Sequence, residues 1–240
     1  MLALFDADLL VYRIGFTTED VDEGIMKARL RESINLILEA TQATEFKMYL
    51  TADDDPTAFR KRIYPEYKAH RIQPKPKHYR AIREYLQANY DAEVCQGIEA
   101  DDALGITQMV HWKDSDPSII VSIDKDLRQI PGHHYNFVKD EEFEQDYHGG
   151  LKYFYTQLLT GDSADNIKGV WKCGPVKAAN ILAGAETEQE MFNRVRETYS
   201  NDEEFLLNAR VLWIWKQPND DWIHHYERLT NGELLTAGQD

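Results

Sequence analysis

The sequence predicts an α/β fold with a mostly parallel central sheet flanked by helices, followed by a helical C-terminal part. Two observations lead to this prediction. Apolar or β-branched runs of strand length alternate with segments of helical spacing, the order that builds parallel sheets. From Gly149 onward the pattern becomes helical. The chain has 240 residues, which suits one α/β domain with a helical extension and an ample core.

Each element rests on its own residues. Apolar or β-branched composition over a short length predicts strands at residues 2–5, 46–51, 92–95 and 118–123. Apolar residues three or four apart, or an acidic group that opens such a segment, predict helices around 30–38, over 79–88 and from 99 towards 110. We therefore expect an α/β core at residues 1–148, which includes a basic arch at 60–90, and a helical subdomain at 149–240.

Composition limits the classes of partner. The chain has 27 basic and 42 acidic side chains, a net charge of −15, which argues against binding a polyanion over the whole surface. Residues 60–83 nevertheless hold nine Lys or Arg against one Glu, so part of the chain could bind nucleic acid. Two cysteines without zinc spacing and the lack of a long apolar run predict a protein of the reducing cytoplasm, without a membrane segment.

Carboxylates recur in tight groups, each at the edge of an apolar run. The residues concerned are Asp6, Asp53, Glu99, Asp101, Asp102, Asp124, Asp126, Asp162 and Asp165. Because carboxyl ends of parallel strands share one edge of a sheet, many of these side chains should converge, and they would repel one another unless cations lay between them. Ligands that are oxygen only favour Mg²⁺ or Mn²⁺ over zinc. A simple helix cap remains the alternative for Asp101 or Asp162 taken singly.

Two further segments combine features of nucleic-acid binding. In residues 64–71 tyrosines alternate with cations, which suits base stacking and phosphate contacts, although a solvated helix face has the same composition. Residues 161–184 are predicted as two short helices joined by a glycine-rich turn. Lys168, Lys172 and Lys177 surround that turn, which favours sequence-independent binding of a duplex backbone, and an ordinary helical hairpin is the alternative.

Together these motifs resemble the flap endonuclease family of 5′ nucleases. The resemblance rests on the motifs Phe5-Asp6-Ala7-Asp8, Asp53 seven residues before Arg60, Tyr64-Pro-Glu-Tyr-Lys68 through Arg71, Gly97-Ile-Glu-Ala-Asp-Asp102, Ser122-Ile-Asp-Lys-Asp-Leu127 and Gly161-Asp-Ser-Ala-Asp-Asn-Ile-Lys-Gly-Val170. They stand in the family's order over about residues 1–185 and are closest to bacteriophage 5′-3′ exonucleases and the polymerase-associated 5′ nucleases of bacteria. The resemblance implies a PIN-like nuclease core and a helix-turn-helix at about 161–184.

The resemblance also implies roles for individual residues. One Mg²⁺ would be held, partly through water, by Asp6, Asp53, Glu99, Asp101 and Asp124. Asp102, Asp126, Asp162 and Asp165 would hold or orient the second. Lys68 matches the lysine that contacts the scissile phosphate, Tyr67 the aromatic that packs against the terminal base, and Arg71 completes the catalytic group. The DNA contacts would come from Arg60, Tyr64, Lys168, Gly169, Val170, Lys172, Gly174 and Lys177.

The chain departs from the family pattern at two places. Gln157 stands where family members usually carry a lysine, and Lys172 replaces the middle glycine of the turn. The family's turn often binds a monovalent cation such as K⁺, and our hypothesis is that the lysine-rich turn partly substitutes for it. The short, proline-broken segment after Lys68 predicts a small arch over the site rather than a long helical clamp.

The predicted function is Mg²⁺-dependent 5′-3′ exonuclease or flap endonuclease activity on DNA in phage or bacterial replication or repair. The expected partners are DNA with 5′ ends, nicks or flaps, RNA–DNA hybrids and replication proteins, with the enzyme a monomer. Two alternatives remain. Asp6-Ala7-Asp8 and Gly161-Asp162 also resemble haloacid-dehalogenase-like phosphatases, and a DNA-binding module without catalysis would share the basic segments.

Overall fold

The computed structural model describes residues 1–232, so the last eight residues of the predicted helical subdomain, 233–240, lie outside the described part. A six-stranded sheet has the order β3-β2-β1-β4-β5-β6. Its strands are β1 (Leu2–Asp6), β2 (Glu45–Thr51), β3 (Glu93–Cys95), β4 (Ser118–Val121), β5 (Gly132–Asn136) and β6 (Glu141–Gln145). Strands β1 to β5 run parallel and only the edge strand β6 is antiparallel to its neighbour in this sheet. The predicted mostly parallel sheet is therefore confirmed.

Strand β1 lies between β2 and β4, and the chain leaves it towards β2 and β3 before returning to its other side with β4. Such a reversal of strand order opens a crevice at the carboxyl ends of the two strands. Strands β5 and β6 were not predicted, because His133, His134 and the glutamates of β6 give no run of β-branched or alternating apolar residues.

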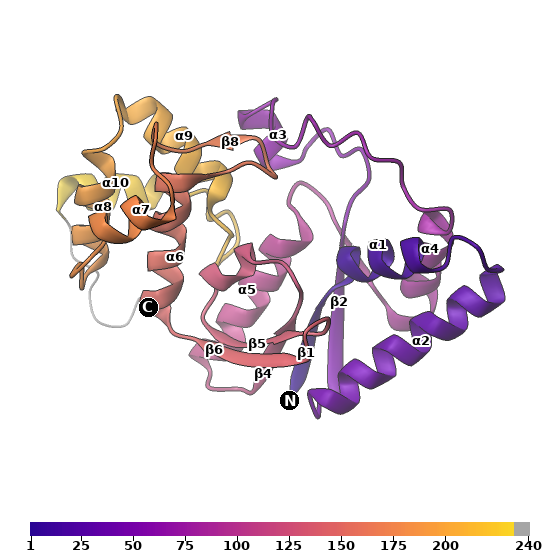
Figure 1. The fold of residues 1–240 in the computed structure, drawn as a ribbon. Coiled ribbons are helices and arrows are strands. Elements are labelled where there is room, and N and C mark those ends of the chain that lie inside the picture. Colours follow the sequence, from indigo (N-terminus) through magenta and orange to yellow (C-terminus); the bar gives the residue numbers. More distant parts are fainter. Residues whose placement is uncertain (233–240) are drawn as a thin grey trace.

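Helices cover both faces of the sheet (Figure 1). Those of the first part are α1 (Ala7–Thr17), α2 (Glu23–Ala40), α3 (Phe59–Ile63), α4 (Tyr79–Tyr90), α5 (Ala100–Lys113) and the 3₁₀ turn η1 (Asp126–Gln129). Alternate residues of β1 point to opposite faces, so Ala3 and Phe5 pack with α1, α2 and α4, whereas Leu2 and Leu4 pack with α5.

The C-terminal part has its own core. It is built from α6 (Tyr147–Thr160), α7 (Pro175–Ile181), α8 (Glu188–Arg196), α9 (Asp202–Leu212) and α10 (Ile223–Asn231). These helices enclose Phe154, Trp213 and Trp222. The centroid of the Phe154 ring lies 4.8 Å from that of Trp213 and 5.5 Å from that of Trp222. In Figure 1 this group lies to one side of the sheet, beyond α5.

The prediction of two short helices within residues 161–184 was wrong for the first of them. Strands β7 (Gly161–Asp162) and β8 (Ile167–Lys168) form an antiparallel pair there, and α7 follows after a turn. A Cβ on Gly161 would lie 2.3 Å from the backbone nitrogen of Gly169, and a Cβ on Gly169 would lie 2.2 Å from that of Gly161. The two glycines therefore allow two backbone segments to touch, which a helix would not require.

The basic arch has no helix between Ile63 and Tyr79, as the proline-broken sequence predicted. Among the helices of residues 1–232, none combines the length and the apolar character needed to cross a membrane.

Candidate active site

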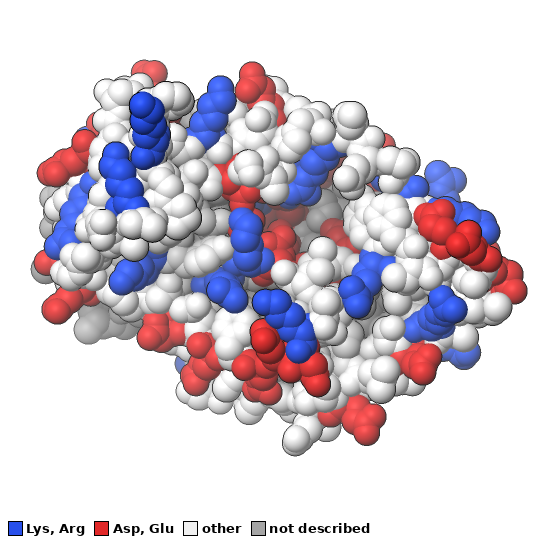
Figure 2. Space-filling view, viewed as in Figure 1, with Lys and Arg blue, Asp and Glu red and all other residues white. Residues whose placement is uncertain are grey.

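A cavity of about 360 Å³ opens at the carboxyl ends of the central strands. Seven carboxylates line it: Asp6, Asp8, Asp53, Asp55, Glu99, Asp101 and Asp124. Figure 2 shows acidic side chains in a hollow in the middle of this face, with Lys and Arg around it. The cavity thus lies where the reversal of strand order between β1 and β4 places a ligand crevice.

Asp6 and Asp124 are linked by one hydroxyl. Asp6 ends β1 and caps α1, where it accepts a hydrogen bond from the Leu9 backbone nitrogen at 3.4 Å. The Ser122 hydroxyl, just after β4, donates to Asp6 Oδ2 at 2.8 Å and accepts from the Asp124 backbone nitrogen at 2.9 Å. The two adjacent parallel strands therefore bring the two carboxylates together, as predicted from their positions at strand ends.

The charge of these carboxylates is costly. Burial, together with the charges of Asp8 and Asp124, raises the pKa of Asp6 to about 7. Burial, with Asp6 and Asp124, raises the pKa of Asp101 well above its ordinary value. A group of oxygen ligands that repel one another in this way fits a divalent cation such as Mg²⁺, whose charge would offset the repulsion.

Basic side chains separate the carboxylates. Within residues 1–232, no three Asp, Glu, His or Cys side chains converge closely enough, as they stand, to hold one metal ion. Lys68 Nζ lies 2.6 Å from Glu99 Oε1 and 3.9 Å from Asp165 Oδ2. Lys68 therefore occupies the space between Glu99 and Asp165.

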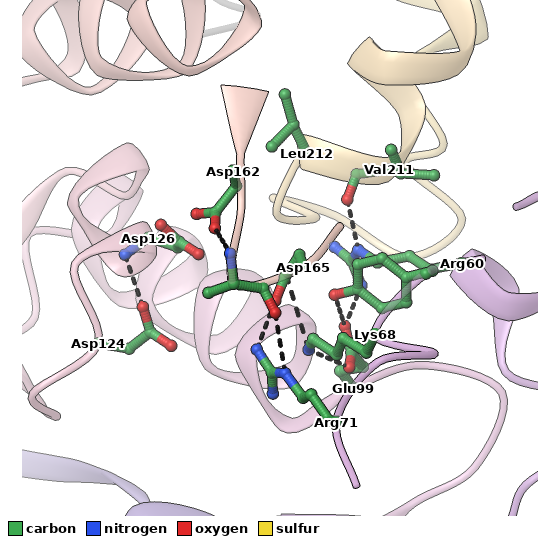
Figure 3. A network of polar contacts seen from close by, with 12 residues as sticks. Arg60, Lys68, Arg71, Glu99, Asp124, Asp126, Asp162, Asp165, Val211 and Leu212 are labelled. Atoms are coloured by element: carbon green, nitrogen blue, oxygen red, sulfur yellow. Dashed lines mark hydrogen bonds and ion pairs between the residues drawn. The ribbon is translucent and has the colours of Figure 1, made fainter. Parts of the chain in front are cut away.

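A second acidic group contains Asp126 and Asp162, which Figure 3 shows near Asp124, and Lys125 forms ion pairs with both. Lys125 Nζ contacts Asp126 Oδ1 at 3.0 Å and Asp162 Oδ2 at 2.5 Å. Gln157 Nε2 donates to Asp126 Oδ1 at 2.7 Å, so the residue that replaces the family's lysine holds this carboxylate through a neutral amide. Burial and the charge of Asp124 raise the pKa of Asp126 to about 6. The structure therefore places Asp126 and Asp162 together, as the sequence predicted.

Lys68 is held between the two groups. Its backbone has φ of 55° and its N–H donates to the Asp165 carbonyl at 3.1 Å, which ties the arch to the loop after β7. Burial alone would raise the pKa of Glu99, but Lys68 and Arg60 lower it to about 2. Glu99 is therefore an anion held by two cations.

Arg71 joins the same loop from the arch. Its guanidinium donates to Asp165 Oδ1 at 2.5 Å and to the Ala164 carbonyl at 3.0 Å, and its side chain is half exposed. Figure 3 shows Arg71 and Lys68 side by side, both directed at Asp165. The two predicted catalytic cations thus flank one predicted metal ligand.

The assignment of Arg60 to DNA and of Asp102 to a metal was wrong. Arg60 is 4% exposed and Asp102 is fully buried. The guanidinium binds both Asp102 oxygens, at 2.6 and 2.8 Å, and the Trp213 carbonyl at 2.6 Å. Asp102 also accepts from the backbone nitrogens of Glu99 and Trp215, both at 3.1 Å. Arg60 therefore has no exposed surface for DNA, and Asp102 has no free oxygen for a metal ion. The pair instead joins the arch, α5 and the C-terminal part.

The predicted contact of Tyr67 with a terminal base also fails, whereas Val170 is only partly buried and its DNA contact stays a prediction. The Tyr67 side chain is 4% exposed and packs into the C-terminal core, so its ring is not available to a terminal base. Its hydroxyl donates to Glu99 Oε2 at 2.7 Å, which makes it a positioning residue. Val170 packs partly against the same core and its N–H already donates to the Leu159 carbonyl at 2.9 Å. Gly169 serves the close approach to Gly161.

Asp53 lies at the rim of the cavity and is half exposed. Lys75 Nζ contacts its Oδ1 at 2.6 Å and the Tyr79 hydroxyl donates to the same oxygen at 2.7 Å. The arch therefore closes over the site on this side through Asp53 and on the other through Asp165.

The remaining predicted DNA contacts lie on the surface. Lys168, Lys172, Gly174 and Lys177 are exposed along the turn and α7. Tyr64 is half-buried and its hydroxyl donates to the Asn166 carbonyl at 3.0 Å. These residues stay predictions.

Sequence reasoning missed Asp8 and Lys125. Asp8 lies in the cavity, where it accepts from the Thr51 backbone nitrogen and from Arg83, both at 2.9 Å. Its position two residues after Asp6 was the signal. Lys125 stands between Asp124 and Asp126 in the sequence, and only the fold shows that it reaches Asp162.

Known 5′-3′ exonucleases and flap endonucleases are similar to this chain in sequence. The model of the 5′-3′ exonuclease N-terminal, resolvase-like domain matches residues 1–153. A flap endonuclease Xni of Shewanella sp. (strain W3-18-1) is 29% identical over 155 residues, which are 59% of this chain and 58% of that protein. The 5′-3′ exonuclease of Buchnera aphidicola subsp. Schizaphis graminum (strain Sg) is 27% identical over 229 residues, 88% of this chain and 79% of that protein. The chain thus spans only 58% to 66% of the length of the Shewanella relatives.

The fold is shared with a phage protein. The T5 D15 protein co-crystallized with metal ions superposes with a TM-score of 0.68 at 16% identity, covering 97% of this chain and 96% of that one. The bacteriophage T5 D15 flap endonuclease in complex with DNA and metal ions gives a TM-score of 0.65 at 16% identity, covering 97% of both chains. Because the domain model also matches well over half of the sequence, this chain belongs to the 5′-3′ exonuclease family.

Proposed function

We propose that the protein is a metal-dependent 5′-3′ exonuclease and structure-specific flap endonuclease that hydrolyses DNA phosphodiesters. The observation that carries this proposal is the cavity that seven carboxylates line together with Lys68 and Arg71 of the basic arch. Mutually repelling oxygen ligands favour divalent metal, and the adjacent cations favour a phosphate. The phosphatase alternative loses its support, because the chain belongs to the 5′-3′ exonuclease family.

Each part of the site has a distinct task in this proposal. Asp6, Asp53, Glu99, Asp101 and Asp124 would hold one Mg²⁺, with Asp8 beside them, and Asp126, Asp162 and Asp165 would hold the other. Two bound ions would lower the pKa of a water and stabilise the leaving oxygen of an in-line displacement. Mn²⁺ would serve in place of Mg²⁺, since it prefers similar ligands.

The protein's own cations would position the substrate. Lys68 and Arg71, which flank Asp165, would contact the scissile phosphate and offset its charge. Tyr67, Arg60 and Asp102 would hold Glu99 and the start of α5 in place. The metal ions, when bound, would supply an activated water as the nucleophile, so the proposal needs no covalent intermediate on the protein.

The exposed lysines of the turn would hold the duplex at a fixed distance from the cut. Lys168, Lys172 and Lys177 contact phosphates in this proposal, with Gly174 and Tyr64 nearby, and K⁺ is only partly required because the lysines supply charge. The substrates would be DNA with 5′ ends, nicks or flaps and also RNA–DNA hybrids. We propose that the enzyme acts as a monomer in phage or bacterial replication or repair, together with replication proteins.

Product sizing tests the proposal. Purified protein is incubated with blunt, nicked and flapped duplexes that are labelled at the 5′ or the 3′ end, with Mg²⁺ or with chelator. We expect short 5′-labelled products with Mg²⁺ and none with chelator. Binding without cleavage under every metal condition would instead support the DNA-binding module.

A further inference from the structure

Trp171 is unusually exposed for its residue type. Its side chain is 82% exposed, whereas Trp112 is 36% exposed and Trp213, Trp215 and Trp222 are buried. The exposed indole stands directly after Val170, in the turn between β8 and α7. Large apolar side chains that stand free on a surface mark interaction sites when they belong to a wider binding patch.

The backbone imposes this exposure. The Cys173 nitrogen donates to the Val170 carbonyl at 3.0 Å, which closes a four-residue turn with Trp171 and Lys172 at its centre. Lys172 has φ of 55°, the left-handed conformation that the third position of a type II turn requires. Cys173 is buried while Trp171 points outward. The tryptophan is therefore held at the tip of a defined turn.

The surroundings of Trp171 are basic. Residues 166–185 contain three lysines and no Asp or Glu. Within residues 1–232, none of Lys168, Lys172 and Lys177 takes part in an ion pair, and Lys172 Nζ lies 5.7 Å from the centroid of the Trp171 ring. Val176, at 79% exposed, adds apolar surface. On a chain with a net charge of −15, this local patch is suited to an anionic partner.

The position of the patch favours DNA over other anionic partners. The β7–β8 pair that carries Asp162 leads directly into the turn, so the patch is tied by backbone to the cavity. A duplex backbone alternates apolar deoxyribose with phosphate, which matches an indole among lysines. We propose that Trp171 is a duplex-contact residue whose ring packs on deoxyribose while the three lysines bind the flanking phosphates. This inference rests on the proposed nuclease function and adds a contact to it.

The first test measures duplex affinity. Binding of the full chain to a labelled blunt duplex is followed by anisotropy in the presence of chelator, so that cleavage does not interfere. We expect Trp171→Ala to weaken binding by roughly tenfold, the scale of an aromatic contact to nucleic acid. Leu36→Ala is the matched control, because Leu36 is another exposed apolar residue, on α2, and should change the affinity by less than about twofold.

The second test reads Trp171 itself. Acrylamide quenches exposed tryptophans, so duplex should reduce quenching of the wild type and of Trp112→Phe, but not of Trp171→Phe. Equal melting curves by circular dichroism would exclude misfolding of the variants. Wild-type duplex affinity in Trp171→Ala, or unchanged acrylamide quenching of the wild type on adding duplex, would overturn the inference.

Failure of the inference is distinguishable from failure of the proposed function. If the wild type cleaves flapped DNA while Trp171→Ala retains full duplex affinity, only the inference fails. If the wild type neither binds nor cleaves DNA, both fail. Protection of Trp171 by anionic lipid vesicles, with no protection by duplex, would also overturn it and would indicate a membrane partner.

Discussion

Two sets of cations in this molecule differ in how they are held. Lys68, Arg71 and Lys125 lie among the carboxylates and each forms at least one ion pair with them. The lysines of the 166–185 segment stand on the surface, where no acid of that segment opposes them. A cation held by carboxylates has a fixed position, which suits it to contact a reacting group. An unpaired surface cation instead offers its full charge to a polyanion.

The total charge hides this division. A net charge of −15 counts the carboxylates of the cavity in full, although basic side chains already contact Glu99, Asp53 and Asp8. The surface lysines lie outside the cavity and would contribute long-range attraction that falls with salt. Rate and affinity should therefore respond to different residues, and the following experiments test that separation.

The largest expected effect comes from removing a cavity carboxylate. Asp124→Asn should lower the cleavage rate by at least about 10³-fold, because the proposed metal loses a ligand. Duplex affinity should stay the same or rise, since a charge that repels phosphate is removed. Single-turnover cleavage and binding in chelator measure the two quantities.

Asp54→Asn is the control for this variant. Asp54 is an exposed neighbour of Asp53 with φ of 51°, a conformation that asparagine tolerates, and its loss removes the same charge. Wild-type cleavage by Asp124→Asn would break the assignment of the cavity as the catalytic site.

A buried basic residue should affect folding and not DNA affinity. Arg60→Met leaves the fully buried Asp102 carboxylate without its guanidinium and should lower the free energy of unfolding by about 3 to 5 kcal/mol. Arg71→Met, at a half-exposed site, should cost much less. Urea unfolding followed by circular dichroism compares them. Equal stability of the two variants would contradict the structural role of Arg60.

Lys216 differs from both sets of cations, because its Nζ is buried and has no hydrogen-bond partner among residues 1–232. Burial lowers the pKa of Lys216 from 10.5 to about 7. The unfolded chain binds a proton more tightly, so Lys216 destabilises the fold fully below pH 7, and this penalty fades as the pH rises towards 10.5.

Lys216→Met should therefore melt higher than the wild type at pH 7, and the difference should shrink at higher pH. The Trp213 ring 3.6 Å from Nζ partly stabilises the charged form, which limits the gain. Melting temperatures from pH 6 to 10 test this, with Lys61→Met, an exposed site, as the control. A pH-independent difference would count against the lowered pKa.

The smallest expected effect concerns the turn. Lys172→Gly relieves a left-handed residue, but glycine also increases the entropy of the unfolded chain, so stability should change by less than about 1 kcal/mol. Duplex affinity should fall by a few-fold and should become more dependent on K⁺ at constant ionic strength. Unchanged K⁺ dependence would contradict the hypothesis that the lysine substitutes for the cation.

The sequence was sufficient to predict the parallel sheet and the edge of it at which the cavity lies, although two of its six strands were not predicted. Strand β1 ends at Asp6, and Asp53 and Asp124 follow shortly after β2 and β4, so local pattern and parallel topology together locate the site. Strands β5 and β6 could not be predicted from the sequence, because pairing with neighbouring strands, and not their composition, makes them strands.

The site predictions that were wrong concern residues whose partners are distant in sequence. Arg60 belongs to a basic run, and only α3 decides that it points inward while Lys61 and Arg62 stay exposed. Its partners, Asp102 and the Trp213 carbonyl, come from α5 and the segment after α9. Neither spacing nor composition contains that information, because it depends on how the C-terminal part packs on the core.

The most direct test of the account compares Lys68→Ala with the double variant Lys168→Ala/Lys177→Ala on one flapped duplex with Mg²⁺. We expect Lys68→Ala to slow single-turnover cleavage by about 10²-fold with little loss of affinity. The double variant should weaken binding and reduce its salt slope by about two, with a near-normal rate at saturation. Equal losses of rate and affinity in both variants would contradict the division between the two sets of cations.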